Sequence, residues 1–158
     1  MDLKTVVVAL SITAVSLHAV IAATADDVSV LKEATSLLVE LASIKSHGGD
    51  TAGVQTAAEW LGGRFSERGF KVRHLAGDKS GDPPFLFAER PATPGAPIVL
   101  FYMHYDTQPP GPSADWPSTE GQPFTPRLWT GRHDDPASRP IPVAELTAAT
   151  AGEARLYA

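Results

Sequence analysis

The chain has 158 residues and a formal net charge of −5, with 13 Lys and Arg against 18 Asp and Glu. This balance argues against a general nucleic-acid-binding protein, which normally carries a basic excess or a basic stripe. The chain has no cysteine, which excludes a disulfide scaffold, a thiol nucleophile and a Cys-type zinc or iron–sulfur site. A mean hydropathy of −0.06 fits a soluble globular protein and excludes a polytopic membrane protein.

Residues 1–25 are predicted to be an export signal. Lys4 precedes an apolar run from Val6 to Ala23, and the Ala-Thr-Ala sequence ending at Ala25 fits a signal-peptidase site. Cleavage is therefore expected after Ala25, which would place residues 26–158 in the periplasm or outside the cell, free of the membrane. The alternative is an uncleaved anchor, because about 18 apolar residues are just long enough to cross a bilayer.

Two helices are predicted after the signal, from the three- and four-residue spacing of apolar side chains. Asp26 or Asp27 would cap the first and Gly48-Gly49 would end it, while the second would run from 51 to 68 and end at Gly69. Both apolar stripes are expected to be core. They consist of Val28, Leu31, Ala34, Leu37, Leu38 and Leu41 in the first helix, and Val54, Ala57, Ala58, Leu61 and Phe65 in the second.

Three strands are predicted next, at Phe70–His74, Pro84–Glu89 and Ile98–Met103. The third is a run of six apolar residues, which is typical of a strand buried on both faces. Two helices followed by these strands indicate an α/β fold. Residues 109–151 are rich in proline and are expected to form a long, ordered but irregular loop.

The residues that carry chemistry follow the third predicted strand. Ligand sites of open α/β sheets lie beyond the carboxyl ends of strands, which is where His104 stands. Asp106 is two residues further on, so both side chains point to the same side of an extended chain. Asp106 can then accept the imidazole N–H of His104 and leave the other ring nitrogen free for a metal. His-x-Asp alone is a weak signal, more often found as a surface pair.

A wider set of residues resembles the amino-terminal part of a known family. The matching features are the run from Pro97 to Asp106, the His-Tyr-Asp-Thr-Gln-Pro sequence from His104, then Trp116 and the Pro-Phe-Thr-Pro sequence at 123–126. They are similar to the dinuclear zinc hydrolases of metallopeptidase family twenty, which include carnosinase-type dipeptidases, aminoacylase, acetylornithine deacetylase and succinyl-diaminopimelate desuccinylase. The helix pair also matches, so the resemblance covers nearly all of residues 28–126.

The resemblance implies a fold, a metal centre and a reaction. The fold would be a zinc-peptidase-like three-layer sandwich with a mixed sheet, incomplete at its carboxyl end. His104 would bind one of two zinc ions, and Asp106 would orient it as an active-site residue. In intact relatives the two ions activate a water that cleaves an amide bond, while a Glu moves its proton. The substrate would be a peptide or an N-acyl amino acid, and a homodimer is expected only for the full-length parent.

The chain departs from the family after residue 126. The family continues with a hairpin ending in Leu-Tyr-Gly-Arg-Gly-x-x-Asp-Asp-Lys-Gly, whose first Asp bridges the metals. Residues 128–135 contain Gly-Arg and an Asp pair, but Pro136 replaces the Lys and the spacing is one residue short, so they are interpreted as a decoy. Residues 152–158 match the strand leading into the motif, which makes 127–151 an insertion and puts the bridging Asp beyond Ala158.

The sequence thus predicts an amino-terminal hydrolase fragment that is inactive alone, with one zinc ligand and neither the bridging Asp nor the catalytic Glu. The alternative is an exported, non-catalytic α/β binding module or a degenerate relative. Peptidase and deacylase activity stay open, although Gln108-Pro109 and Pro123-Phe124 favour a peptidase. No serine-hydrolase elbow or nucleotide-binding loop occurs. Of the other histidines, His18, His47 and His74 are interpreted as structural or solvent-facing, and His133 is undecided.

Overall fold

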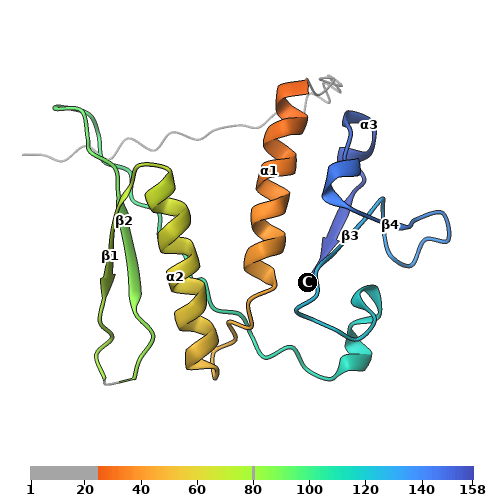
Figure 1. The fold of residues 1–158 in the computed structure, drawn as a ribbon, viewed down its shortest axis with the longest axis horizontal. Helices are drawn as coiled ribbons and strands as arrows, with labels where there is room; N and C mark the ends of the chain where they lie inside the picture. The colour runs from red at the N-terminus through yellow and green to blue at the C-terminus, as the bar shows by residue number, and fades with distance from the viewer. Residues whose placement is uncertain (1–24, 80) are drawn as a thin grey trace, which may run out of the picture.

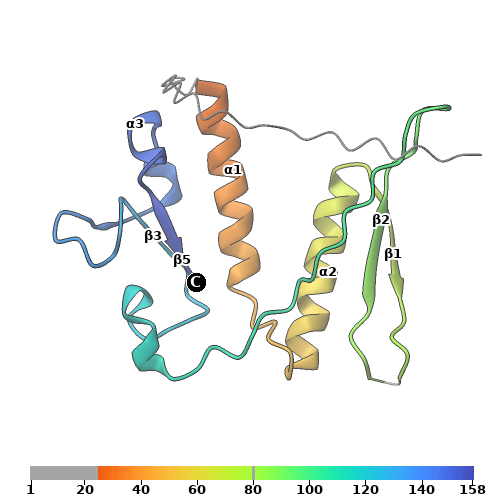
Figure 2. The same cartoon turned by 180° about the vertical axis from the view of Figure 1, so that it is seen from behind.

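The computed structural model describes residues 25–79 and 81–158, drawn as ribbons in Figures 1 and 2. The predicted export signal lies outside the described residues apart from Ala25. The fold is a mixed α/β fold, as predicted. Its helices are α1 (Ala25–Ala42), α2 (Thr51–Glu67) and α3 (Ala148–Ala151), and its strands are β1 (Lys71–Leu75), β2 (Phe85–Glu89), β3 (Arg127–Trp129), β4 (Pro140–Ile141) and β5 (Arg155–Tyr157).

Helix α2 begins and ends where its sequence predicts. The Asp50 side chain accepts a hydrogen bond from the Gly53 N–H at 2.9 Å, which satisfies one of the free donors of the first turn. Gly69, at φ 79°, adopts the left-handed conformation that terminates the helix. The buried face of α2 consists of small residues, Val54, Ala57, Ala58 and Gly62. Small side chains let the β1–β2 hairpin approach the helix closely.

Helix α1 lies between α2 and the sheet formed by β3, β4 and β5 (Figures 1 and 2). It starts at Ala25, ahead of both predicted cap residues, and it ends at Ala42 rather than at Gly48-Gly49. None of its described side chains is buried, and Leu38 is 52% exposed. The prediction that the apolar stripe of α1 is core is therefore wrong for this structure, because too few elements cover it.

Polar side chains connect the two long helices. The Trp60 indole N–H donates to Glu40 at 3.2 Å, and the Arg68 guanidinium pairs with Glu33 at 2.7 Å. Such exposed contacts contribute little to stability individually. No helix within residues 25–79 and 81–158 is long and apolar enough to span a membrane.

The described strands form two separate antiparallel sheets. β1 pairs with β2 from Lys71↔Glu89 to Leu75↔Phe85, which confirms the first two predicted strands. The second sheet has the strand order β4-β3-β5. The buried side chains of Leu128, Ile141 and Leu146 form its hydrophobic core. The described strands do not form the mixed sheet that the resemblance implied.

The region after residue 109, predicted to be an irregular loop, contains two strands of the second sheet. β3 and β4 lie within the expected loop, together with the short 3-10 turns Ser113–Asp115, Pro117–Thr119 and Val143–Glu145. β5 forms at the predicted place, and Arg127 of β3 pairs with Tyr157 of β5. The paired strands β3 and β5 therefore enclose residues 130–154, whereas the segment that the sequence predicts to be an insertion is 127–151.

The third predicted strand is wrong. Residues 98–103 form no strand in the structure, and their side chains are between 70% (Val99) and 88% (Tyr102) exposed. A strand needs a neighbour to bond its backbone groups, and neither described sheet extends to this run. The apolar pattern predicts burial on both faces, and no described element supplies that burial.

Candidate active site

The His-x-Asp motif is positioned by a short stretch of chain just before α2, residues 46–48. The Thr107 N–H donates to the Ser46 carbonyl and the Gly48 N–H donates to the Thr107 carbonyl, both at 3.0 Å. These two bonds form a parallel bridge between His47 and Thr107. Ser46 is only 2% exposed. The motif is thus attached to the amino-terminal end of α2 although about sixty residues separate the two in sequence.

Tyr105 attaches the same motif to the start of β2. Its hydroxyl donates a hydrogen bond to the Pro84 carbonyl. Partial burial, and to a lesser extent the negative charge of Asp106, raise the pKa of the Tyr105 phenol. The phenol therefore stays protonated and remains a donor at neutral pH. Together with residues 46–48, this contact fixes the backbone on both sides of the motif.

His104 and Asp106 lie next to each other, as their spacing predicts. His104 Nδ1 is 2.9 Å from the Asp106 carbonyl oxygen and 3.4 Å from Asp106 Oδ1. A carbonyl oxygen can only accept, so this contact assigns the proton to Nδ1 and leaves Nε2 with a free lone pair. The closer partner is the backbone carbonyl and not the carboxylate that the sequence predicts. The His104 side chain is 84% exposed, so its ring is accessible to a ligand.

These two residues line a cavity of about 540 Å³. Its walls come from the start of α2, the loop between β1 and β2, and the segment ending at the motif. The lining residues are Gly48, Gly49, Thr51, Val54, Gly77, Asp78, Asp82, Pro83, Pro84, Phe85, Tyr102, Met103, His104, Tyr105 and Asp106. Asp78 and Asp82 are the other carboxylates in this lining, which contains no Lys or Arg. The cavity is therefore an acidic pocket with one imidazole.

The described residues do not complete a metal centre. No group of three or more His, Asp or Glu side chains within residues 25–79 and 81–158 is placed to hold a metal ion. A catalytic zinc usually has three protein ligands, whereas His104 has only Asp106 as a close carboxylate neighbour, at 3.4 Å.

The remaining motif residues shape the chain that follows the site. The Trp116 indole N–H donates to the Pro110 carbonyl at 2.6 Å, and the Gly121 N–H donates to the Trp116 carbonyl at 2.8 Å. Phe124 lies against His47, with ring centroids 6.4 Å apart. These contacts fold residues 110–124 back toward the 46–48 segment. Trp116 and Phe124 thus have structural contacts that support the site from outside the cavity.

The Gly-Arg-His-Asp-Asp stretch after β3 lies apart from the cavity lining. Arg132 and Asp134 form a two-pronged ion pair at 2.9 and 2.7 Å. The His133 ring stands edge-on to Tyr157, with centroids 5.0 Å apart and planes at 87°. Neither Asp134 nor His133 lines the pocket of His104. This part of the chain forms a local polar cluster on the second sheet.

The Arg132–Asp134 pair gives a pH prediction. Its hydrogen bonds lower the pKa of the Asp134 carboxyl from 3.8 to about 2. Because the pKa of Asp134 is lower in the folded state, the ion pair stabilises the fold at pH values above the ordinary carboxyl pKa. This stabilisation is lost as the pH falls through about 2. Carbon-detected NMR of the Asp134 carboxyl should show this midpoint. Arg132→Gln should return the midpoint toward 3.8, whereas Arg155→Gln should not change it; an unchanged midpoint in Arg132→Gln would contradict the assignment.

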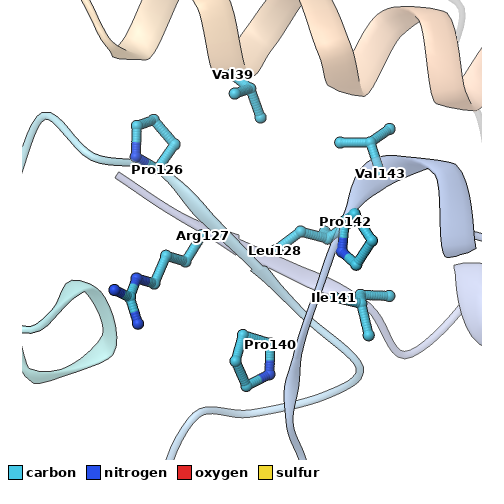
Figure 3. A pocket seen from close by; sticks show the side chains of 8 residues that line it. All are labelled: Val39, Pro126, Arg127, Leu128, Pro140, Ile141, Pro142 and Val143. Carbon is cyan, nitrogen blue, oxygen red and sulfur yellow. The ribbon is translucent and has the colours of Figure 1, made fainter.

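A second cavity, of about 450 Å³, lies between α1 and the second sheet (Figure 3). Its lining is apolar except for Arg127: Val39, Pro126, Arg127, Leu128, Pro140, Ile141, Pro142 and Val143. Figure 3 shows the Arg127 side chain directed away from Val39 and Val143, and its guanidinium bonds both Glu120 oxygens, at 2.6 and 2.7 Å. No group there could act as an acid, base or nucleophile, which leaves the His104 pocket as the candidate site.

Part of the chain is similar in sequence to a known enzyme. Over 95 residues the chain is 36% identical to a succinyl-diaminopimelate desuccinylase of Stenotrophomonas maltophilia (strain R551-3). The matched stretch is 60% of this chain and 22% of the desuccinylase, so the chain spans only a small part of that relative. No family model matches the chain, and no solved structure matches it. The comparison supports, at a coarse level, a relationship to the hydrolases that the sequence resembles.

Proposed function

We propose that this chain carries the amino-terminal part of the catalytic domain of a metal-dependent hydrolase that cleaves an amide bond. The observation that carries the proposal is the arrangement of His104, whose Nδ1 is occupied by Asp106 while Nε2 is free in an open pocket. A ring held in one tautomer by a neighbouring oxygen is the usual state of a metal-binding histidine. The similarity to a desuccinylase supports the same reaction class.

Each residue of the motif has a distinct part in this proposal. His104 provides one metal ligand through Nε2. Asp106 holds the ring through its carbonyl and its carboxylate, and the carboxylate makes the bound imidazole a stronger donor. The bonds of Thr107 to residues 46–48 keep both side chains at the mouth of the pocket. Since the described residues lack the other ligands, the chain alone is proposed to be inactive.

The proposed substrate is an N-acyl amino acid or a peptide. The name of the relative favours the N-acyl class, because a desuccinylase releases succinate from an amide. The sequence features that favoured a peptidase, Gln108-Pro109 and Pro123-Phe124, lie outside the cavity lining. Both substrate classes therefore belong in the first assay.

The first test uses the purified 158-residue chain. With added zinc it should hydrolyse neither an N-succinyl amino acid nor a dipeptide at a rate above the buffer control. A chelator-sensitive activity that disappears in His104→Ala would show that the chain is a complete enzyme. That result would contradict the proposal that this chain supplies only part of the metal site. Matched assays of His74→Gln, on β1 and outside the pocket, control for trace contaminants.

The second test reads the gene beyond codon 158. A frame that continues into Arg-Gly-x-x-Asp-Asp-Lys-Gly would supply the metal-bridging carboxylate that the proposal requires, and the extended protein could then be assayed with the same substrates. A stop codon at that point would favour the non-catalytic binding module instead.

We also propose that the protein is exported, with cleavage after Ala25. Such cleavage would remove only the first residue of α1. The protein recovered from the periplasm or medium should have the intact mass of a chain that begins at Asp26. The mass of the full 158-residue chain, found in the membrane fraction, would favour the uncleaved anchor.

A further inference from the structure

Two walls of the His104 cavity are distant in sequence. One consists of the loop between β1 and β2 with the first residue of β2, and the other is the segment that ends at Asp106. Within residues 25–79 and 81–158, one direct hydrogen bond joins these two walls, from the Tyr105 hydroxyl to the Pro84 carbonyl. The placement of the motif against the opposite wall therefore depends on this contact.

The carbonyl that accepts this bond is firmly held. Two consecutive prolines, Pro83 and Pro84, have their φ angles fixed by their rings. The next residue, Phe85, pairs with Leu75 in the β1–β2 hairpin, and the hairpin packs on α2. The hydroxyl of Tyr105 thus connects the motif to the packed unit of α2 and the hairpin.

The His104 ring is held by a contact that spans Tyr105. His104 Nδ1 lies 2.9 Å from the carbonyl oxygen of Asp106, two residues further on. The backbone dihedral angles of Tyr105 set the direction of the chain between these two residues, so the ring reaches the oxygen only over a narrow range of those angles. Tyr105 is half-buried, and its carbonyl is 3.5 Å from the buried Ser46 hydroxyl. Its backbone and its phenol are therefore held at two separate points.

We infer that Tyr105 is a positioning residue for His104. The bond from its hydroxyl to Pro84 keeps the backbone in the conformation in which Nδ1 contacts Asp106 and Nε2 is left free in the cavity. Tyr105 acts only through His104, whose side chain is 84% exposed and gains little support from packing. This role deepens the proposed function, and it rests on that function where it concerns a metal bound at Nε2.

Nitrogen-15 NMR of the His104 ring in the 158-residue chain tests the inference. At a pH where the ring is neutral, the wild-type spectrum should show the proton on Nδ1. Tyr105→Phe keeps the aromatic ring and removes only the hydrogen bond, so His104 should shift toward the mixture of tautomers of a solvent-exposed histidine. Tyr102→Phe is the matched control, because Tyr102 lines the same cavity, is 88% exposed and loses the same hydroxyl; it should leave the spectrum unchanged.

The backbone amide spectrum of α2 and the β1–β2 hairpin checks that each variant is folded. A wild-type ring with its proton on Nε2 would overturn the inference without any variant. An unchanged His104 spectrum in Tyr105→Phe, or an equal change in Tyr102→Phe, would overturn it as well.

Zinc binding adds a readout in an extended protein that binds the metal. Tyr105→Phe should weaken zinc binding about tenfold, as is usual when a residue that orients a ligand is altered, and Tyr102→Phe should not. Failure of the extended protein to bind metal or to hydrolyse an amide would overturn the proposed function, while the ring spectra of the 158-residue chain would still decide the role of Tyr105.

Discussion

A Gly53→Ala variant should be destabilised by about 3 kcal/mol or more relative to the wild-type chain. An added Cβ at this position would lie 1.8 Å from the Lys45 carbonyl oxygen and 2.7 Å from the Lys45 carbonyl carbon. Both atoms belong to the backbone, so no side-chain rotation can relieve the clash. The variant must either move the start of α2 or displace the chain leading into Ser46.

The same helix provides the control for this substitution. Gly63 has no atom within 4 Å of an added Cβ, so Gly63→Ala should stabilise α2 by roughly 0.5–1 kcal/mol through helix propensity. Urea unfolding followed by circular dichroism measures both free energies of unfolding. If the two variants unfold at the same urea concentration, Lys45 does not approach α2 as closely as the structure has it.

In an extended protein that hydrolyses an amide, His104→Ala should abolish turnover and Asp106→Asn should lower it by about 10–100-fold. Removing His104 deletes the proposed metal ligand. Asn in place of Asp106 retains an oxygen near Nδ1 and leaves the backbone carbonyl contact of 2.9 Å unchanged, but it removes the negative charge. The loss in Asp106→Asn should therefore be partial.

Bound zinc, counted per chain by mass spectrometry of metals, separates these roles from loss of folding. His104→Ala should lose metal while its thermal unfolding stays close to that of the wild type, because His104 is 84% exposed. His133→Ala serves as the control, since its ring packs on Tyr157 outside the pocket. Full activity in His104→Ala, or loss of metal in His133→Ala only, would place the metal centre elsewhere.

The sequence predicted those elements whose signals are local. α2 has its cap, its apolar spacing and its terminating Gly69 within about twenty residues, and β1 and β2 are bounded by turn residues. The failures at Ile98–Met103 and along α1 have one physical cause. An apolar pattern reports that a segment favours burial, but it does not report which other segment covers it.

In the candidate site, too, local contacts could be predicted from the sequence and long-range contacts could not. The spacing of His104 and Asp106 predicts their contact, because both lie in one short stretch of chain. In the sequence, the signals at residues 46–48, which hold that stretch in place, are a helix stop at Gly48-Gly49 and a His47 interpreted as structural or solvent-facing. Their bonds to Thr107 join segments that are distant in sequence, and such pairing leaves no periodic pattern from which it could be predicted.

The attachment of Thr107 to residues 46–48 also sets the order in which the chain can assemble. The Ser46–Tyr105 contact spans 59 residues, and closing a loop of that length costs an entropy on the order of 4 kcal/mol. The β1–β2 hairpin and its packing on α2 involve much shorter loops and can form first, which shortens the effective loop that remains. The pocket of His104 would thus be completed late in folding. Transient opening of the bonds to residues 46–48, together with the Tyr105–Pro84 contact, would release the motif while α2 and the hairpin stay folded.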